Sequence, residues 1–523
     1  MKRYILLSLL ASAIAAQAQD SYANERLINS SSDVIGTARY VGMGGALGAL
    51  GADISVISWN PAGIGLYRKN DVALTFGGLW GKSYISEENR GKGTFDQAGF
   101  VYNIKTGNET CPYVNFSFNY QKKINFNHNF YADNPNLGGL SQMDQLSQLT
   151  ELYEAVEGTA YNITELALSN NKDGLFFDKN DLSNPYRSYA NYYTHHSEGS
   201  LQSFDFNLST NINNRAFLGL TIGLDNMRYR GWSDYYETGD GGYGLYDYDI
   251  HVSGTGVNVK LGGIFRPIED SPFRFGFAVE TPTWYRLKRD SYFNLYDTDG
   301  MRTPDGDSYL RYKLRSPWKV RASVGSTVGS LLAWDVDYEF AAYAGTKMGY
   351  PYYNDSWKGN TQDQAMNQLT RDNLRGTHTL RVGIEANATK NLAFRLGYNL
   401  STSAYKKNIS FDQYHLNSYA IDQSSRTNYA MDQSSSTSYM RMGTTNILTL
   451  GMGYHWKSFY VDLAYKLRNQ SADFYAFDTS FTDYNTGDPV FLQNNLNLAN
   501  KTIDPVDVNL TRHAITCTLG FKF

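Results

Sequence analysis

The side chains best placed to do chemistry are basic residues at alternate positions of the segment 307–327. Successive side chains of a β-strand point to opposite faces, so a strand here would gather five cations on one face: Arg311, Lys313, Arg315, Lys319 and Arg321. We expect this face to line an enclosed interior, where it could bind a carboxylate or another anion. We therefore take Arg315, Lys319 and Arg321 as candidate ligand-binding residues.

Further cations are expected on the inward faces of later segments, at Arg381, Arg395, Lys466 and Arg512. Glu385 and Asp462 lie in the same segments and offer these cations ion-pair partners, which would give the charges a structural role. A basic interior also fits a channel for small anionic solutes.

Other clusters of polar residues predict no catalytic or metal site. The adjacent pair His195-His196 has no ligand partner at helical spacing and is expected to be solvated in a loop. The acidic run Asp297-Thr-Asp299-Gly300, followed by Asp305-Gly-Asp307, lacks the rest of an EF-hand and predicts a solvated turn. Gly42-x-Gly44 is not a dinucleotide fingerprint, because Leu occupies position 47. No Ser/His/Asp or Cys/His set is evident, so we predict no enzyme, no cofactor and no metal.

The elements that must position these residues are strands of alternating hydropathy. Leu218, Leu220, Ile222 and Leu224, for example, alternate with Gly, Thr, Gly and Asp. We expect fourteen such segments, near 72–82, 94–104, 113–123, 201–211, 215–229, 248–266, 271–289, 307–327, 331–345, 376–389, 391–406, 440–456, 457–472 and 510–523. Every second connection is short, whereas those between are long, at 124–200, 230–247, 290–306, 346–375, 407–439 and 473–509. This asymmetry is typical of an all-β, 14-stranded antiparallel transmembrane β-barrel.

Composition agrees with a barrel. The chain of 523 residues has 42 Tyr, 27 Phe and 47 Gly but only 12 Pro and 2 Cys, which suits aromatic girdles and closely packed strands. A mean hydropathy of −0.46 and the lack of a long apolar run after the N-terminus exclude helical spans. A net charge of −4 gives no basic footprint for nucleic acid. The last segment ends in Phe523 and resembles the signal by which the barrel assembly machinery recognises its clients.

The N-terminal part divides into two regions. Residues 1–18 carry Lys2 and Arg3, an apolar stretch and the small-x-small site at positions 16–18, which predicts a signal peptide. Residues 19–70 contain a glycine-dense run with few charges, which suits packing inside a container as a hatch. Residues 71–523 then form the barrel. The loop 124–200 is expected to be partly helical, between Ser141 and Glu157, and a ten-residue repeat at 419–437 is expected to form a solvated arm.

The hatch carries a more specific resemblance. Gly36-Thr-Ala-Arg39, Gly42-Met-Gly44-Gly45-Ala, Gly51-Ala-Asp53 and Asn60-Pro61-Ala62-Gly63 resemble the N-terminal hatch of the FadL/TodX family of outer-membrane transporters. The segments Thr281-Pro282-Thr283-Trp284 and Ser316-Pro317-Trp318-Lys319-Val320-Arg321 also resemble that family. The resemblance implies a multi-pass barrel in the outer membrane of a Gram-negative-type bacterium and passive transport of hydrophobic molecules, expected to be long-chain fatty acids. It implies that Asn60, Pro61, Ala62 and Gly63 take part in gating.

The expected partners are a hydrophobic small-molecule ligand, outer-membrane lipid and the barrel assembly machinery, with no nucleic acid and a monomeric state. Alternatives remain open at this point: uptake of haem or aromatic hydrocarbons by the same fold, a porin-like channel for anionic solutes, or an outer-membrane hydrolase.

Overall fold

The computed structural model describes residues 33–81, 91–137, 188–239, 242–269, 271–296, 306–351, 360–362, 367, 370–371, 373–406, 439–475 and 505–523. Several expectations lie outside these residues: the signal peptide 1–18, residues 19–32 of the hatch, the helix between Ser141 and Glu157, the aspartates at 297, 299 and 305, and the repeat at 419–437. No helix among the described residues is long and apolar enough to cross a membrane.

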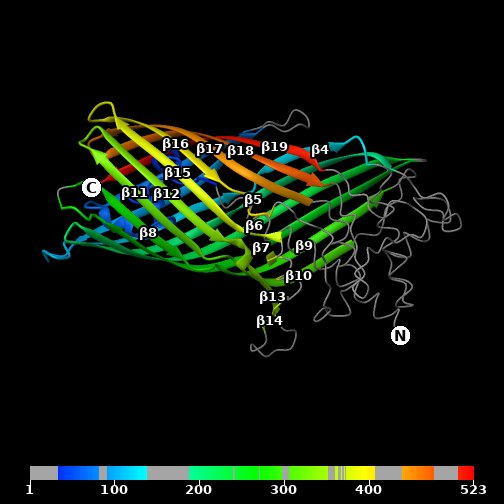
Figure 1. Ribbon diagram of the computed structural model, residues 1–523, viewed down its shortest axis with the longest axis horizontal. Helices are drawn as coiled ribbons and strands as arrows, with labels where there is room; N and C mark the ends of the chain where they lie inside the picture. Colours follow the sequence, from blue (N-terminus) through cyan, green and yellow to red (C-terminus); the bar gives the residue numbers. More distant parts are fainter. Residues whose placement is uncertain are drawn as a thin grey trace.

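Nineteen strand segments form one closed antiparallel sheet (Figure 1). They are β1 (Asp71–Gly81), β2 (Lys92–Lys105), β3 (Tyr113–Asn125), β4 (His128–Asn134), β5 (Ser188–Ile212), β6 (Ala216–Gly239), β7 (Gly242–Phe265), β8 (Arg274–Glu280), β9 (Trp284–Tyr296), β10 (Gly306–Arg315), β11 (Lys319–Val328), β12 (Leu332–Ala342), β13 (Lys347–Pro351), β14 (Asn360–Gln362), β15 (Gly376–Asn387), β16 (Leu392–Ser401), β17 (Tyr439–Trp456), β18 (Phe459–Tyr475) and β19 (Val506–Lys522). The sheet closes because β1 pairs with both β2 and β19.

The segments combine into the fourteen strands that the sequence predicts. β3 and β4 both pair with β5, and β8 and β9 both pair with β7, so each couple is one strand interrupted by a short break. β10 and β11 pair with β9 and β8 and form the third broken strand. β13 and β14 are a short hairpin beside β10. Each predicted segment overlaps an observed strand, and the predicted fourteen-stranded barrel is confirmed.

Several predicted boundaries are wrong. The segments 271–289 and 307–327 are each divided, because residues 281–283 separate β8 from β9 and residues 316–318 separate β10 from β11. The predicted loop 230–247 is largely a continuation of β6 and β7, and the predicted loop 124–200 contains β4 and the first half of β5. These parts were missed because their inward side chains include tyrosines and histidines among apolar residues, which blurs the alternation of hydropathy.

The short connections lie together at one end of the barrel, which we call the short-turn end. Its turns use left-handed backbone at Asn213 (φ 51°), Asn214 (φ 54°), Gly329 (φ 56°) and Lys457 (φ 55°), as tight hairpins require. The C-terminus lies at this end (Figure 1), where the backbone of Phe523 pairs with that of Asn70 through hydrogen bonds of 3.0 and 3.1 Å.

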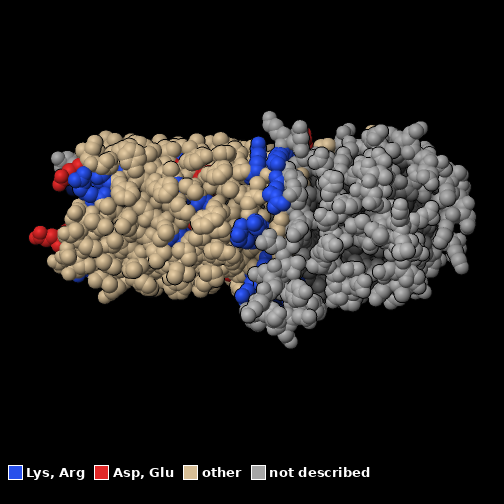
Figure 2. All heavy atoms as spheres, turned by 60° about the horizontal axis from the view of Figure 1, so that its bottom comes forward, with Lys and Arg blue, Asp and Glu red and all other residues tan. Residues whose placement is uncertain are grey.

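The outer wall carries a belt of exposed apolar side chains, as a barrel embedded in lipid requires. Figure 2 shows this uncharged surface along much of the barrel, with Lys and Arg gathered at its edge. The belt includes Leu74, Phe100, Phe116, Phe206, Leu220, Leu261, Phe277, Val320, Phe340, Ile384, Leu396, Leu450, Leu463 and Leu519. Polar residues alternate with them and point inward, as Thr221, Asp225 and Asn258 do.

Residues 33–70, here called the inner segment, lie inside the barrel near the short-turn end. The segment contains three short helices, α2 (Ala38–Gly42), η1 (Ile54–Ser58) and η2 (Pro61–Leu66), drawn in dark blue in Figure 1. Thr37, Asp53 and Asn60 cap them, since each side chain accepts a hydrogen bond from the backbone of the first turn. Its apolar side chains form a small core with inward residues of β1, β2, β17 and β18.

Candidate functional site: an apolar ring, a cavity and the inner segment

The five cations predicted to share one face of the segment 307–327 in fact lie on both faces of the wall. Arg321 on β11 is buried, and Lys319 lines an internal cavity, so these two candidates point inward as predicted. Arg315 lies on β10, beyond the break at 316–318, and its neighbour Leu314 is the residue that lines the cavity. The inward face changes from odd to even positions across the break.

The prediction is therefore wrong for the cations of β10, which point outward: Arg311, Lys313 and Arg315. The physical reason is local. Pro317 has no N–H to donate to the ladder, and residues 316–318 bulge out of the pairing between the two halves of the strand. An extra residue in a strand reverses the faces of every residue that follows it.

Arg321 is a structural cation. Its guanidinium forms ion pairs with Glu280 (2.5 Å) and Glu339 (2.6 Å) from the neighbouring strands. It also donates to the carbonyl oxygen of Trp59 (3.0 Å) and stacks over the Trp59 ring, 4.5 Å from its centre. Arg381 stacks over the same ring at 3.6 Å. The two arginines thus hold the inner segment against the wall, and Arg321 already has two carboxylate partners.

The four residues predicted to act in gating form a compact turn, as their types indicate. The Asn60 side chain accepts from the N–H of Ala62 (3.2 Å) and donates to the carbonyl oxygen of Gly48 (2.8 Å). Pro61 is the first residue of η2. Gly63 packs against Val56 so closely that an added Cβ would lie 2.5 Å from its methyl carbon. The turn is buried throughout.

Glycines in the wall allow this turn to press against the strands. A Cβ on Gly219 of β6 would lie 2.4 Å from the carbonyl carbon of Pro61, and one on Gly262 of β7 would lie 2.1 Å from Oδ1 of Asn60. These distances are shorter than any real contact, so only glycine fits at these positions.

Two aspartates of β12 hold the next loop of the inner segment. The Asp337 carboxylate accepts from the N–H groups of Leu47 and Gly48 (3.1–3.2 Å), and Asp335 accepts from those of Ala49 (3.0 Å) and Leu50 (2.8 Å). Four backbone donors that would otherwise lack partners are satisfied by two buried side chains.

Of the remaining inward cations, Arg395 is the one that pairs with the carboxylates offered by the sequence, whereas Arg381 bonds to the Tyr40 hydroxyl of the inner segment. Arg395 contacts both Glu385 and Asp462 at 2.6 Å. Arg39 of the inner segment also reaches Glu385 at 3.0 Å. Burial alone would lower the pKa of Arg39, but Glu385 outweighs this effect and raises it above the usual range. These charges attach the segment to the wall.

A separate cationic site lies on β18 and β19, and Asp33 occupies it. The Asp33 carboxylate contacts Lys466 Nζ at 2.6 Å and an Arg512 nitrogen at 3.0 Å. Arg468, two residues along β18, points the same way and donates to Gln470 (2.7 Å). Burial would raise the pKa of Asp33, but the neighbouring cations outweigh it and hold the pKa well below its usual range. Asp33 is therefore a carboxylate bound at a site made by the wall.

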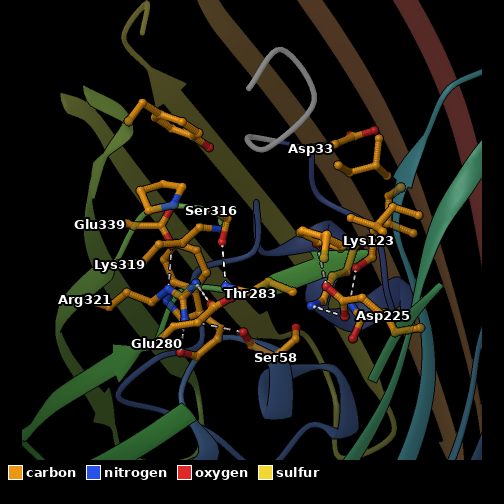
Figure 3. Close-up of a pocket in the computed structure, with 18 of the residues that line it drawn as sticks. Asp33, Ser58, Lys123, Asp225, Glu280, Thr283, Ser316, Lys319, Arg321 and Glu339 are labelled. Carbon is orange, nitrogen blue, oxygen red and sulfur yellow. Dashed lines mark hydrogen bonds and ion pairs between the residues drawn. The ribbon is translucent and has the colours of Figure 1, made fainter. Parts of the chain in front are cut away.

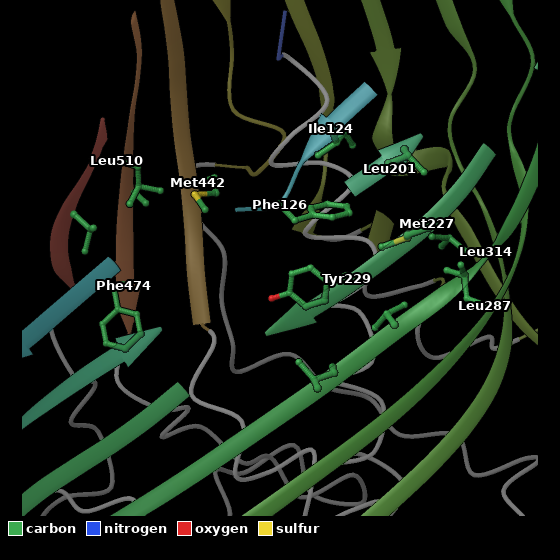
Figure 4. Close-up of a cluster of buried hydrophobic side chains, with 14 of the residues drawn as sticks. Ile124, Phe126, Leu201, Met227, Tyr229, Leu287, Leu314, Met442, Phe474 and Leu510 are labelled. Atoms are coloured by element: carbon green, nitrogen blue, oxygen red, sulfur yellow. The ribbon is translucent and has the colours of Figure 1, made fainter. Parts of the chain in front are cut away.

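Beyond the inner segment, the lining of the barrel changes from polar to apolar. Figure 4 shows buried apolar side chains that project inward from several strands of the wall, among them β3, β5, β6, β9, β10 and β17 to β19. We call this set the apolar ring; its labelled members are Ile124, Phe126, Leu201, Met227, Tyr229, Leu287, Leu314, Met442, Phe474 and Leu510. On β19 the change takes one step, because Leu510 of the ring is the next inward residue after Arg512.

A cavity of about 110 Å³ lies between the apolar ring and the inner segment (Figure 3). Ile124, Leu201 and Leu314 of the ring line it, and Trp59 and Asp33 of the inner segment line it as well. Polar groups of two of the broken strands, β8/β9 and β10/β11, also line it: Glu280, Thr283, Ser316, Lys319 and Arg321. The cavity therefore has apolar and charged sides, as a site for an amphipathic molecule would.

Sequence reasoning missed the apolar ring and Asp33. The ring is visible in the sequence only as apolar residues at inward positions of the outer parts of strands, such as Leu314, which the predicted single strand placed outward. His195 was expected in a loop but is buried on β5, 3.3 Å from the Tyr193 hydroxyl. His196 stacks on Trp232, with ring centres 5.4 Å apart.

No family model matches the chain, and no curated protein matches it. Among solved structures, it is similar to a FadL homologue from Pseudomonas aeruginosa, with 13% identity, a TM-score of 0.50, and coverage of 94% of this chain and 98% of that one. The P. putida toluene transporter TodX is 10% identical, with a TM-score of 0.46 and coverage of 94% of this chain and 99% of that one. The CymD monoaromatic hydrocarbon channel is 10% identical, with a TM-score of 0.48 and coverage of 94% of this chain and 97% of that one. The first similarity shows a shared fold and confirms the predicted resemblance at that level.

Proposed function

We propose that this chain, which shares the barrel fold of the FadL homologue, is an outer-membrane channel through which hydrophobic small molecules pass without energy coupling. The observation that carries the proposal is the order of three features along the barrel. An apolar ring leads to a cavity, and the cavity rests on an inner segment that occupies the lumen. A water-filled pore for small polar solutes would have a polar lining at this level.

The apolar ring is the proposed binding chamber. Its side chains come from β3 to β7, β9, β10, β13 and β17 to β19, so a ligand within it would exchange much of its contact with water for contact with apolar atoms. Each CH₂ group that leaves water contributes about 0.8 kcal/mol. An acyl chain of moderate length would therefore gain enough free energy to bind without a dedicated polar contact.

The finer proposal is that the ligand is a long-chain carboxylate. Lys466 and Arg512 lie at the foot of the ring, next to Leu510, and they already bind the carboxylate of Asp33. A fatty acid whose tail occupied the ring would bring the same chemical group to the same cations. It would then compete with Asp33, and this competition would release one attachment of the inner segment.

The route out of the cavity is proposed to lead through the broken strands. Residues 281–283 and 316–318 interrupt neighbouring strands at the same level, and Thr283, Ser316 and Pro317 line the cavity. Two bonds bridge the gap, from Thr283 N–H to the Ser316 hydroxyl (2.8 Å) and from Ser316 N–H to the Thr283 carbonyl (3.1 Å). Pro282 and Pro317 have no backbone N–H and therefore donate no hydrogen bond here. The wall has fewer bonds here than along a regular ladder.

The test is ligand binding to the purified, folded chain. Phe126→Ala and Leu510→Ala remove apolar atoms from the ring, so together they should weaken binding of a long-chain fatty acid about tenfold or more. Phe394→Ala is the matched control, because that ring is exposed on the outer belt. Equal affinities in the parent protein, the double variant and the control variant would contradict the proposed chamber. Passage of small polar anions without any fatty-acid binding would favour a porin-like channel.

A further inference from the structure

Eight aromatic side chains on the outer wall form one connected cluster. They come from the neighbouring strands β1, β2, β3 and β5, and we call them the aromatic face: Phe76, Phe95, Phe100, Phe116, Phe118, Tyr120, Phe204 and Phe206. Ring centres of neighbours lie 5.1–6.5 Å apart, a range in which aromatic rings attract one another. These contacts link all eight rings across four strands.

The aromatic face extends into the middle of the apolar belt. On β3 two of its rings, Phe116 and Phe118, lie between Val114 and Tyr120, the outward residues at the ends of the apolar stretch. On β17, by contrast, the outward residues on either side of Leu450 are Leu and Met, and rings follow at the short-turn end. Rings of outer-membrane barrels gather in girdles at the two membrane interfaces. A girdle therefore does not explain the rings in the middle of β3.

The middle of the face contains one short side chain. Ala98 of β2 lies opposite Leu74 of β1 and Tyr120 of β3, and along its own strand it lies between Phe95 and Phe100. Its methyl group is shorter than the side chains on all four sides. A ring from a second molecule could therefore pack on Ala98 with its edge toward the surrounding rings, an arrangement that aromatic pairs favour.

The exposed area of the face approaches what a stable interface requires. Five of the rings are 39–48% exposed: Phe76, Phe95, Phe100, Phe116 and Phe206. Because an aromatic side chain can bury about 150–250 Å², these five present about 400 Å². Five apolar side chains of similar exposure lie beside them on the same strands: Val72, Leu74, Tyr102, Ile104 and Leu208. Together they present about 800 Å², the area that each partner buries in a standard interface.

We propose that the aromatic face is the interface between two copies of this chain within the membrane. Both copies would use the same face, related by a twofold axis along the membrane normal. Association in a membrane depends on packing, because lipid tails are as apolar as the side chains that they cover. Rigid rings have defined packing geometries with other rings, and they lose little conformational freedom when they pack.

This inference rests on the membrane location proposed above and not on the transported ligand. It departs from the monomeric state expected from the sequence.

The first experiment measures association in lipid vesicles. Copies of the folded chain carry a donor or an acceptor dye, and energy transfer between them is followed as lipid is added. Transfer should fall with dilution as expected for a dimer. The triple variant Phe100→Ala, Phe116→Ala, Phe206→Ala should weaken association at least about tenfold, because buried aromatic residues dominate the energetics of interfaces. The matched control is Phe277→Ala, Phe340→Ala, Phe394→Ala, which removes three exposed rings from β8, β12 and β16.

The second experiment keeps every ring of the face. Cys111 and Cys517 are replaced by Ser, and one new cysteine is introduced on the outer wall. Ala98→Cys should give a crosslinked dimer with a short thiol-reactive crosslinker in vesicles. Ile384→Cys is the control, because it lies in the belt on β15, on the far side of the barrel, and should not crosslink.

Three results would overturn the proposal: a parent protein that stays monomeric at every dilution, equal weakening in both triple variants, or equal crosslinking at both cysteines. A polycyclic lipid that copurifies with the parent and is lost only in the aromatic-face variant, without association of the parent, would assign the face to that lipid instead.

Discussion

At the scale of single residues, the most informative is Asp33. Its carboxylate is held by Lys466 and Arg512 at the foot of the apolar ring, so the protein itself displays the kind of group that this site accepts. Arg321 is different, because Glu280 and Glu339 already neutralise it. A buried cation with two carboxylate partners has little to gain from a third.

Replacing Asp33 with Asn should therefore change ligand preference. The variant keeps the size of the side chain but removes the charge that competes for Lys466 and Arg512. Affinity for a long-chain fatty acid should rise about tenfold, whereas affinity for the alcohol of equal length should stay the same. Displacement of a fluorescent lipid measures both. The control is Arg441→Gln, which breaks an ion pair with Asp473 on the outward face of β17 and β18. An unchanged affinity for the acid in the Asp33 variant would refute the competition.

At the scale of elements, the strands were predictable and one of their faces was not. Alternation located all fourteen strands because each buries one face and exposes the other, as on β6 with Leu220 outward and Thr221 inward. The break at 316–318 reversed that alternation. A single sequence cannot show whether Pro317 interrupts a strand or ends it, so Arg315 was placed on the wrong face.

The candidate site was predictable only in part, for the same physical reason. The turn at Asn60 and Pro61 is local, so residue type and spacing identified it correctly. The contact of Asp33 with Lys466 joins residues far apart in the chain, and it depends on how the inner segment sits within the barrel. Periodicity holds no information about such contacts.

The fit between the inner segment and the strands leads to a prediction about leakage. Gly219→Ala adds a methyl group where the Pro61 carbonyl carbon would be 2.4 Å away, so the turn at Asn60 must move from the wall. Passage of a small polar dye through liposomes that contain the variant should increase several-fold. The matched control is Gly78→Ala, because nothing lies within 4 Å of a Cβ at that position of β1. Equal dye passage in the two variants would show that the close contact between Gly219 and the turn at Asn60 does not seal the lumen.

At the scale of the whole molecule, the barrel presents two interiors and one exterior. Its outer belt faces lipid. The polar part of its lumen, near the short-turn end, holds the inner segment, and the part of the lumen beyond that segment is lined by the apolar ring. The wall is a closed ladder of backbone hydrogen bonds, so the barrel does not depend on the inner segment for its strand pairing.

The belt gives a prediction about insertion into lipid. Leu450 of β17 is 52% exposed in the belt, so Leu450→Arg should reduce the free energy of unfolding in vesicles by about 2–4 kcal/mol. Ala388→Arg lies in an exposed turn at the short-turn end and should cost about 0–1 kcal/mol. Urea unfolding in lipid vesicles measures both. Similar costs at the two positions would argue against a lipid-facing belt.

The positions of the wall glycines match the shape of the inner segment. Gly219 and Gly262 lack side chains because Asn60 and Pro61 fill the space that those side chains would need. The strands are thus complementary to one particular turn, and the inner segment of another barrel of equal size would leave gaps or clash with them. Transplanting a gate between such proteins would require transferring the wall glycines that contact it as well.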